Sequence, residues 1–85
     1  MTFACETAEA ILTAKFGVPP ERMDTKAVLA SLDLDSLAVI ELLHVLGREL
    51  DIRIGEDEVT PRHTVGQLVA VAEQKLARRA TGPRP

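Results

Sequence analysis

The chain has 85 residues and a formal net charge of −3, from 10 lysines and arginines against 13 aspartates and glutamates. This length fits one small domain, and with two Phe and no Trp or Tyr the chain lacks the stacking surfaces that bind single-stranded nucleic acid. The single cysteine, Cys5, excludes an internal disulfide, and no apolar run is long enough to cross a bilayer, so we expect a cytoplasmic protein and no membrane partner.

The first predicted helix runs from about Phe3 to Phe16, because apolar residues repeat at helical spacing in this stretch. Thr2 is a candidate N-cap, and Gly17 is a candidate C-terminal stop. From Gly17 to Leu34 we expect a long loop, with Asp24 or Thr25 capping a short turn over residues 26–30. The loop contains apolar residues that we expect to anchor it to the core: Met23, Val28, Leu29, Leu32 and Leu34.

The second predicted helix, from Ser36 to about Leu50, has the longest uninterrupted helical pattern in the chain. Its apolar stripe is formed by Val39, Leu42, Leu43, Leu46 and Leu50. Ser36 falls at the first or second position, with Asp35 available as N-cap. A serine there is exposed beside free backbone N–H groups at the positive end of the helix dipole, an environment that suits an oxygen carrying a phosphoryl group. Gly47, inside this helix, permits the close approach of another helix or a partner, or is a tolerated surface glycine.

After this helix, the sequence predicts a short helix over residues 56–59, with acids in its first turn and Pro61 ending it. A metal site formed by Asp33, Glu56, Asp57 and Glu58 lacks the spacing of a calcium loop, so we interpret these groups as solvated carboxylates and expect no metal.

Thr64 and Gln67 match a capping box, which predicts the start of a last helix. Its apolar stripe consists of Val65, Leu68, Val69, Ala72 and Leu76. Arg78 and Arg79 suit the C-terminal end of its dipole. We expect a single domain over residues 1–80 and a disordered tail over residues 81–85, which have turn and breaker composition. The pattern predicts an all-α four-helix bundle of three longer helices, one short helix and a long first loop.

The tripeptide Asp35-Ser36-Leu37, preceded by Leu32 and Leu34 and followed by Glu41-Leu42, resembles the phosphopantetheine attachment site of the free-standing acyl carrier proteins. The resemblance covers about Ala8 to Leu76. It implies a bundle of the acyl-carrier type, in which 4'-phosphopantetheine from coenzyme A is joined to Ser36 by a phosphopantetheinyl transferase. The thiol of this arm would hold acyl groups as thioesters, and the protein itself would be a carrier with no catalytic activity.

The partners implied by this resemblance are acyl-loading and acyl-processing enzymes such as a ketosynthase or an acyltransferase, bound weakly by a monomeric carrier. Between Asp33 and Glu58 the net charge is −6, which favours basic partner surfaces and disfavours nucleic acid. We expect these partners to recognise one patch around the serine, formed by Asp35, Leu37, Ile40, Glu41 and His44.

The chain departs from the usual carrier pattern at four positions: Asp33, Ala38, Gly47 and Arg48. Asp33 replaces the usual glycine three residues before the serine, and the other three make the second helix less acidic than in a typical fatty-acid carrier. This favours polyketide or related secondary-metabolite biosynthesis. A fatty-acid-synthesis carrier and a peptidyl carrier stay open as alternatives, although Asp35 before the serine favours the acyl type.

The sequence also bears on two other classes of function. Asp-Ser-Leu also resembles part of the Gly-Asp-Ser-Leu esterase motif, but Leu34 occupies the glycine position. His44 lies two turns from Ser36, and nothing places His63 near it, so we expect no catalytic residues. The alternative of another class is an unmodified helical protein-interaction module.

Overall fold

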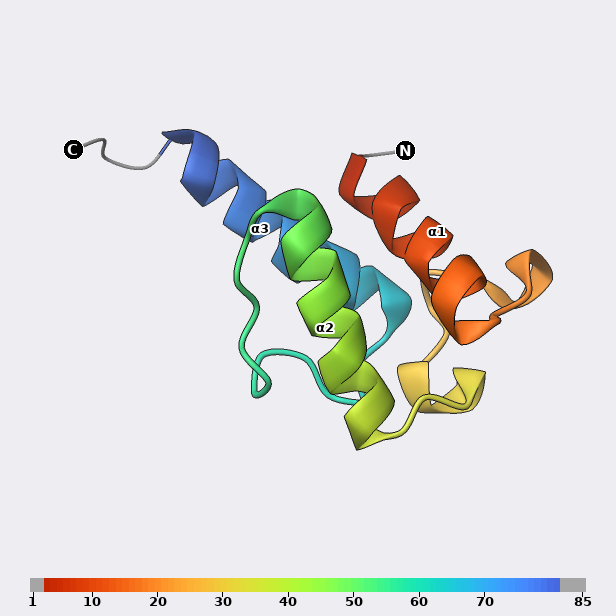
Figure 1. Cartoon of the computed structure of the whole chain (residues 1–85). Coiled ribbons are helices and arrows are strands. Elements are labelled where there is room, and N and C mark those ends of the chain that lie inside the picture. The colour runs from red at the N-terminus through yellow and green to blue at the C-terminus, as the bar shows by residue number, and fades with distance from the viewer. Residues whose placement is uncertain (1–2, 82–85) are drawn as a thin grey trace.

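The structure, a computed structural model, describes residues 3–81, with side chains from 3 to 78. Its α-helices are α1 (Phe3–Phe16), α2 (Ser36–Leu50) and α3 (Val65–Thr81), and two short 3-10 helices, η1 (Pro20–Arg22) and η2 (Leu29–Leu32), lie in the first loop (Figure 1). The expected bounds of α1 and α2 are therefore confirmed, as is the all-α class. Thr2 and residues 82–85, with the expected N-cap and most of the expected tail, lie outside the described residues.

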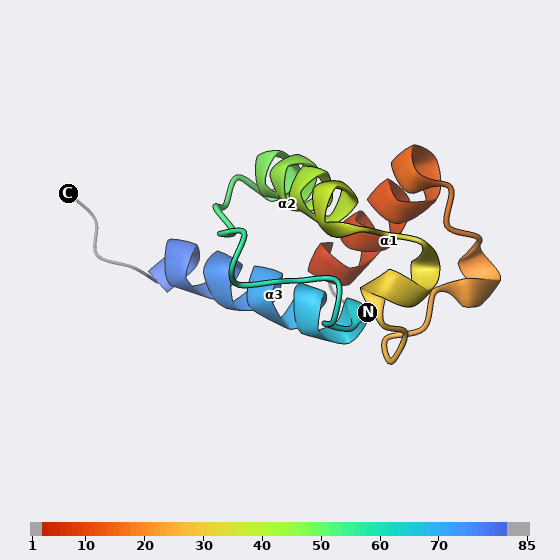
Figure 2. The same ribbon diagram turned by 90° about the horizontal axis from the view of Figure 1, so that it is seen from below.

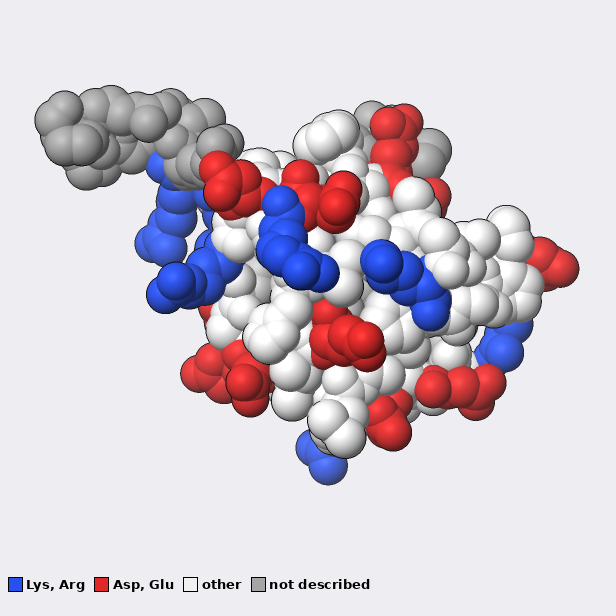
Figure 3. Space-filling model, in the orientation of Figure 1, with Lys and Arg blue, Asp and Glu red and all other residues white. Residues whose placement is uncertain are grey.

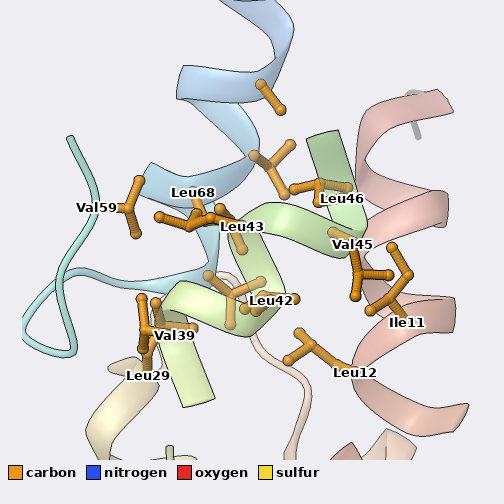
Figure 4. Close-up of a cluster of buried hydrophobic side chains, with 14 of the residues drawn as sticks. Ile11, Leu12, Leu29, Val39, Leu42, Leu43, Val45, Leu46, Val59 and Leu68 are labelled. Atoms are coloured by element: carbon orange, nitrogen blue, oxygen red, sulfur yellow. The ribbon is translucent and has the colours of Figure 1, made fainter. Parts of the chain in front are cut away.

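The helices enclose one core, in which α1 contacts both α2 and α3. Figures 1 and 2 show that α2 lies between α1 on one side and the connection over residues 51–64 on the other. In Figure 4 Leu43 of α2 lies beside Leu68 of α3 and toward Val59 of that connection. In the same view Val39 lies beside Leu29 of the first loop, and Val45 faces Ile11 of α1. Every buried side chain among the described residues is apolar. None of the described helices has both the length and the apolar character that a membrane span requires.

The expected short helix over residues 56–59 is wrong, because this segment forms a turn. The Glu58 amide donates to the Gly55 carbonyl at 3.0 Å, and the Glu58 carboxylate accepts from the Gly55 amide at 2.7 Å. These bonds close the segment on itself, and Pro61 leaves too few residues for a helical nucleus to be extended. Val59, at the end of this turn, and Ile54, just before it, are nevertheless buried in the core. The described fold thus has three α-helices and not four.

The first loop follows the core closely, as expected. Gly17 ends α1 with a φ of +69°, a left-handed conformation that glycine adopts without steric cost. Leu29, Leu32 and Leu34 are buried and Met23 is half-buried. The expectation is wrong for Val28, whose side chain is exposed because the residue is held by a backbone bridge to Thr64. Asp24 caps a turn by accepting from the Lys26 amide at 2.9 Å.

The start of α3 is fully bonded to the rest of the chain. Thr64 and Gln67 form the predicted capping box: the Thr64 amide donates to the Gln67 side chain at 2.8 Å, and the Gln67 amide donates to the Thr64 hydroxyl at 3.1 Å. The next amides, of Val65 and Gly66, donate to carbonyls of the first loop at 2.9 Å and 2.8 Å. The N-terminal donors of this helix are therefore occupied within the protein.

Candidate functional site

Ser36 is the first residue of α2, and it is exposed. Asp35 before it is extended, with φ −86° and ψ −175°, and its carboxylate accepts a hydrogen bond of 2.8 Å from the Ala38 amide. The predicted N-cap is therefore confirmed. The amides of Ser36 and Leu37 precede the first intrahelical hydrogen bond, which is the bond from Val39 to Asp35, so they face outward at the positive end of the helix. This start of α2 is open to solvent, in contrast to the start of α3.

The chain that leads into Ser36 is held by two buried leucines. Leu32 and Leu34 are 5% and 4% exposed, so the exposed Ser36 stands two residues from a core anchor. Between these leucines Asp33 adopts a left-handed conformation with φ +65°, and its amide donates to the Ala30 carbonyl at 3.2 Å. Arg22 adds a second tie, because its guanidinium donates to the Ser31 carbonyl and lies 3.9 Å from the Asp33 carboxylate. Ser36 is thus presented on a rigid support.

The residues that we expect to recognise partners follow Ser36 along the outer face of α2. Leu37 is 75% exposed, Glu41 and His44 are exposed, and Ile40 is half-buried. Leu37, Ile40, Glu41 and His44 follow the i, i+3, i+4, i+7 spacing of one helix face. Together with Asp35 they form an exposed strip that begins beside the serine.

An open groove of about 850 Å³ lies beside the second half of α2, against the connection over residues 51–56. The residues that line it include Glu41, His44, Arg48, Ile52, Arg53 and Glu56. The sequence does not predict this groove or the place of Arg53 along it, because no periodic pattern indicates where a connection returns along a helix.

The geometry does not assemble a catalytic serine. The ring nitrogen Nδ1 of His63 accepts a hydrogen bond of 2.8 Å from the Thr60 amide and lies 3.2 Å from the Thr60 hydroxyl, so this nitrogen is occupied within its own turn. His44 is exposed two helical turns beyond Ser36. Over the described part of the chain, no three His, Cys, Asp or Glu side chains are grouped to hold a metal ion.

Cys5 lies away from this site, in α1, and its side chain is half-buried. Burial raises the pKa of its thiol, and the nearby Glu9 carboxylate, 3.5 Å from the sulfur, raises it further. A raised pKa lowers the fraction of reactive thiolate at neutral pH, so Cys5 is a weak nucleophile.

The site therefore offers an exposed serine at the first position of a helix whose first amides have no partner within the helix. These features fit a hydroxyl that is modified by a long, flexible phosphate-containing group, since the nearby amides and the helix dipole favour an anion.

Comparison with known proteins agrees with this geometry. The family described as "Phosphopantetheine attachment site" matches residues 6–72. The chain is 40% identical over 68 residues to an acyl carrier protein of Amoebophilus asiaticus, which covers 79% of this chain and 85% of that protein. It is 31% identical over 77 residues to an acyl carrier protein of Saccharopolyspora erythraea, with coverage of 89% and 81%. It is also 33% identical over 70 residues to an acyl carrier protein of Streptococcus thermophilus, with coverage of 82% and 92%. No solved structure matches the chain.

Proposed function

Because this chain belongs to the acyl carrier protein family, whose members bear a covalent 4'-phosphopantetheine, we propose that Ser36 is the residue to which this group is attached. The carrier would hold acyl intermediates as thioesters in polyketide or related secondary-metabolite biosynthesis. The observation that supports this proposal most directly is the exposure of Ser36 at the first position of α2.

The choice of Ser36 is strengthened by the other serine of the chain. Ser31 is also exposed, but its hydroxyl donates a hydrogen bond of 2.6 Å to the carbonyl of Val28, the residue just before η2. Ser31 also lies inside a 3-10 turn, whereas Ser36 opens an α-helix of 15 residues. The two serines therefore make a matched pair for a test, because both are on the surface and only Ser36 has the free helix start.

In this proposal the protein's own residues hold Ser36 in place and form the surface that partners recognise, and they catalyse no reaction. Asp35 fixes the first turn through Ala38, and Leu32 and Leu34 anchor the segment before it. When attached, the prosthetic arm supplies the terminal thiol that forms the thioester. Because one protein then carries its cargo to each enzyme, each step benefits from a high effective concentration of the acyl group. The carrier is in this view a substrate of a phosphopantetheinyl transferase.

The strip formed by Asp35, Leu37, Ile40, Glu41 and His44 is the surface that we propose for contact with the transferase and with a ketosynthase or an acyltransferase. An exposed leucine beside the site favours this role, because a partner that covers Leu37 removes its apolar surface from water. Such contacts are small, so binding would be weak and fast, and we place the monomeric carrier in the cytoplasm.

The assignment to a polyketide or related pathway is supported by the departures from the common carrier pattern, above all by Arg48 on the exposed face of α2. A fatty-acid-synthesis carrier and a peptidyl carrier are the alternatives. The thioester-bound cargo of the protein isolated from its producing organism, identified by mass spectrometry, would distinguish these three.

The attachment itself is tested by intact mass after incubation with coenzyme A and a promiscuous phosphopantetheinyl transferase. We expect one phosphopantetheine adduct on the wild type and on Ser31→Ala, and none on Ser36→Ala, with equal helicity by circular dichroism in all three. A folded wild type that gains no adduct would overturn the proposal and favour the unmodified helical interaction module. An adduct that persists on Ser36→Ala would show that the attachment residue is a different one.

A further inference from the structure

Arg22 contacts the chain on both sides of the buried Leu32. The guanidinium nitrogen Nη2 donates a hydrogen bond to the Ser31 carbonyl, and Nη1 lies 3.9 Å from the Asp33 carboxylate. Because a guanidinium is planar and rigid, it fixes the spacing of the two groups that it contacts. One side chain of the first loop therefore bridges the two residues that flank a core anchor just before Ser36.

The segment that carries Arg22 is itself held in place. Arg22 ends η1, where its amide donates to the Pro19 carbonyl at 3.0 Å and its own carbonyl accepts from the Asp24 amide at 3.1 Å. Pro19 and Pro20 have a fixed φ, and the half-buried Met23 packs against the core. The guanidinium thus extends from an anchored turn, so it can restrain the groups that it contacts.

Asp33 needs such a restraint because of its backbone. Its φ of +65° and ψ of +29° lie in the left-handed region, which a residue with a Cβ adopts at a cost. This conformation turns the chain from η2 toward α2 while Leu32 and Leu34 on either side stay buried. A change of conformation at Asp33 would displace Asp35 and Ser36, since they follow directly after Leu34.

We propose that Arg22 is a positioning residue for the modification of Ser36, a role that rests on the proposed carrier function. In that reaction the Ser36 oxygen bonds to the pantetheine-bearing phosphorus of coenzyme A and the bond between the two phosphates breaks. Adenosine 3',5'-bisphosphate leaves, and the hydroxyl proton passes to a base of the transferase. The attacking and leaving oxygens must be nearly in line, so a small displacement of the serine slows the transfer. Arg22 acts on this step through the backbone of residues 31–33.

A positive charge that the transferase recognises is the competing role for Arg22. Its side chain is 48% exposed, and Figure 3 shows both basic and acidic side chains on the surface of the first loop. Arg22→Lys separates the two roles. Lysine keeps the charge but has one nitrogen in place of the planar fork, so it cannot restrain Ser31 and Asp33 together in the same way. Lysine would therefore replace a recognised charge fully and a positioning fork only in part.

The experiment measures phosphopantetheine attachment by a promiscuous transferase, with excess coenzyme A and the unmodified carrier as varied substrate. Circular dichroism at the assay temperature gives the folded fraction, and kcat is expressed per folded carrier. We expect kcat to fall about two- to fivefold for Arg22→Ala with KM unchanged, and to fall less for Arg22→Lys. Arg78→Ala, which removes an exposed arginine from α3, is the matched control and should equal the wild type.

Asp33→Asn tests whether Arg22 acts through Asp33. Asparagine also tolerates the left-handed conformation, so this variant removes the ion pair and keeps the backbone preference. Asp33→Asn alone should lower kcat less than Arg22→Ala does, since the bond to the Ser31 carbonyl remains. The double variant should have the same kcat as Arg22→Ala, because that change already removes both contacts. Losses that multiply in the double variant would give the two residues separate roles and overturn the proposal.

The proposed function and the positioning role fail in different ways. A folded wild type that accepts no phosphopantetheine would overturn the carrier function itself. Modification of the wild type together with an unchanged kcat for Arg22→Ala, or with a higher KM alone, would overturn only the positioning role. A kcat for Arg22→Lys equal to that of the wild type would assign Arg22 to charge recognition and would also overturn it.

Discussion

Gly47 and Ile52 are in direct backbone contact. The Ile52 amide donates a hydrogen bond of 2.9 Å to the Gly47 carbonyl, and a Cβ added at Gly47 would lie 2.8 Å from the Ile52 carbonyl oxygen. The glycine therefore makes room for the chain where it returns after α2, and no other described helix lies within 4 Å of the position of an added Cβ. It is buried, so the interpretation as a tolerated surface glycine is wrong.

Replacement of Gly47 by alanine should destabilise the protein, although alanine is the better helix former by about 1 kcal/mol. The new methyl group would overlap a backbone carbonyl that cannot rotate away, and overpacking of this kind costs about 1–3 kcal/mol. We expect the free energy of unfolding in urea to fall. Glu49→Ala, an exposed change in the same turn, serves as the control and should leave stability nearly unchanged. A more stable Gly47→Ala would contradict the close contact with Ile52.

Asp35 should contribute to stability through its cap and to loading through its charge, and two variants separate these roles. Asp35→Ala removes the bond to the Ala38 amide and should lower the free energy of unfolding by about 1 kcal/mol. Asp35→Asn keeps an oxygen at this position and should retain most of that stability. If the Asp35 carboxylate attracts the phosphopantetheinyl transferase, this enzyme should attach phosphopantetheine to both variants more slowly than to the wild type at low salt. Equal loading of Asp35→Asn and wild type would remove Asp35 from the recognition surface.

Asp33 occupies a backbone conformation that favours glycine, with φ +65°, and its side chain is 91% exposed. Asp33→Gly should therefore raise the free energy of unfolding by about 0.5 kcal/mol, while Asp33→Ala should lower it. The loss of the ion pair with Arg22 changes little, since that pair is exposed to solvent. Opposite signs for the two variants in urea denaturation would establish that the backbone conformation dominates; equal losses would assign the larger role to the carboxylate.

Glu58 should make stability depend on pH. The hydrogen bond from Lys75 lowers the pKa of this carboxyl, and the bond from the Gly55 amide lowers it further. A carboxyl whose pKa is lower in the folded state stabilises the protein above its unfolded pKa, near 4.5, and this contribution is lost as pH falls through the folded value.

The comparison is between the wild type and Glu58→Gln, unfolded in urea from pH 3 to pH 7. The wild type should be the more stable protein at pH 7, and the difference should shrink below about pH 4.5. Lys75→Gln should also reduce the pH dependence, because it removes the main cause of the lowered pKa of Glu58, while the bond from the Gly55 amide remains. A difference between wild type and Glu58→Gln that stays constant with pH would argue against the contact with Lys75.

The helices and the candidate serine could be predicted from the sequence because they depend on short-range features. The apolar stripes, the cap at Asp35, the stop at Gly17 and the capping box at Thr64 each involve residues within about one helical turn of one another. An exposed serine at the start of a strongly amphipathic helix follows from the same local rules, and so does its resemblance to a carrier attachment site.

Contacts between distant segments required the tertiary structure. Residues 56–59 form a turn because Glu58 bonds to Gly55 and to Lys75 of α3, 17 positions away, and no local pattern contains that partner. Val28 is exposed because its backbone is bridged to Thr64, and the groove with Arg48 and Arg53 exists because the chain returns past Gly47. Local propensity determines where helices begin and end, whereas packing over long sequence separations decides which surfaces between them stay open.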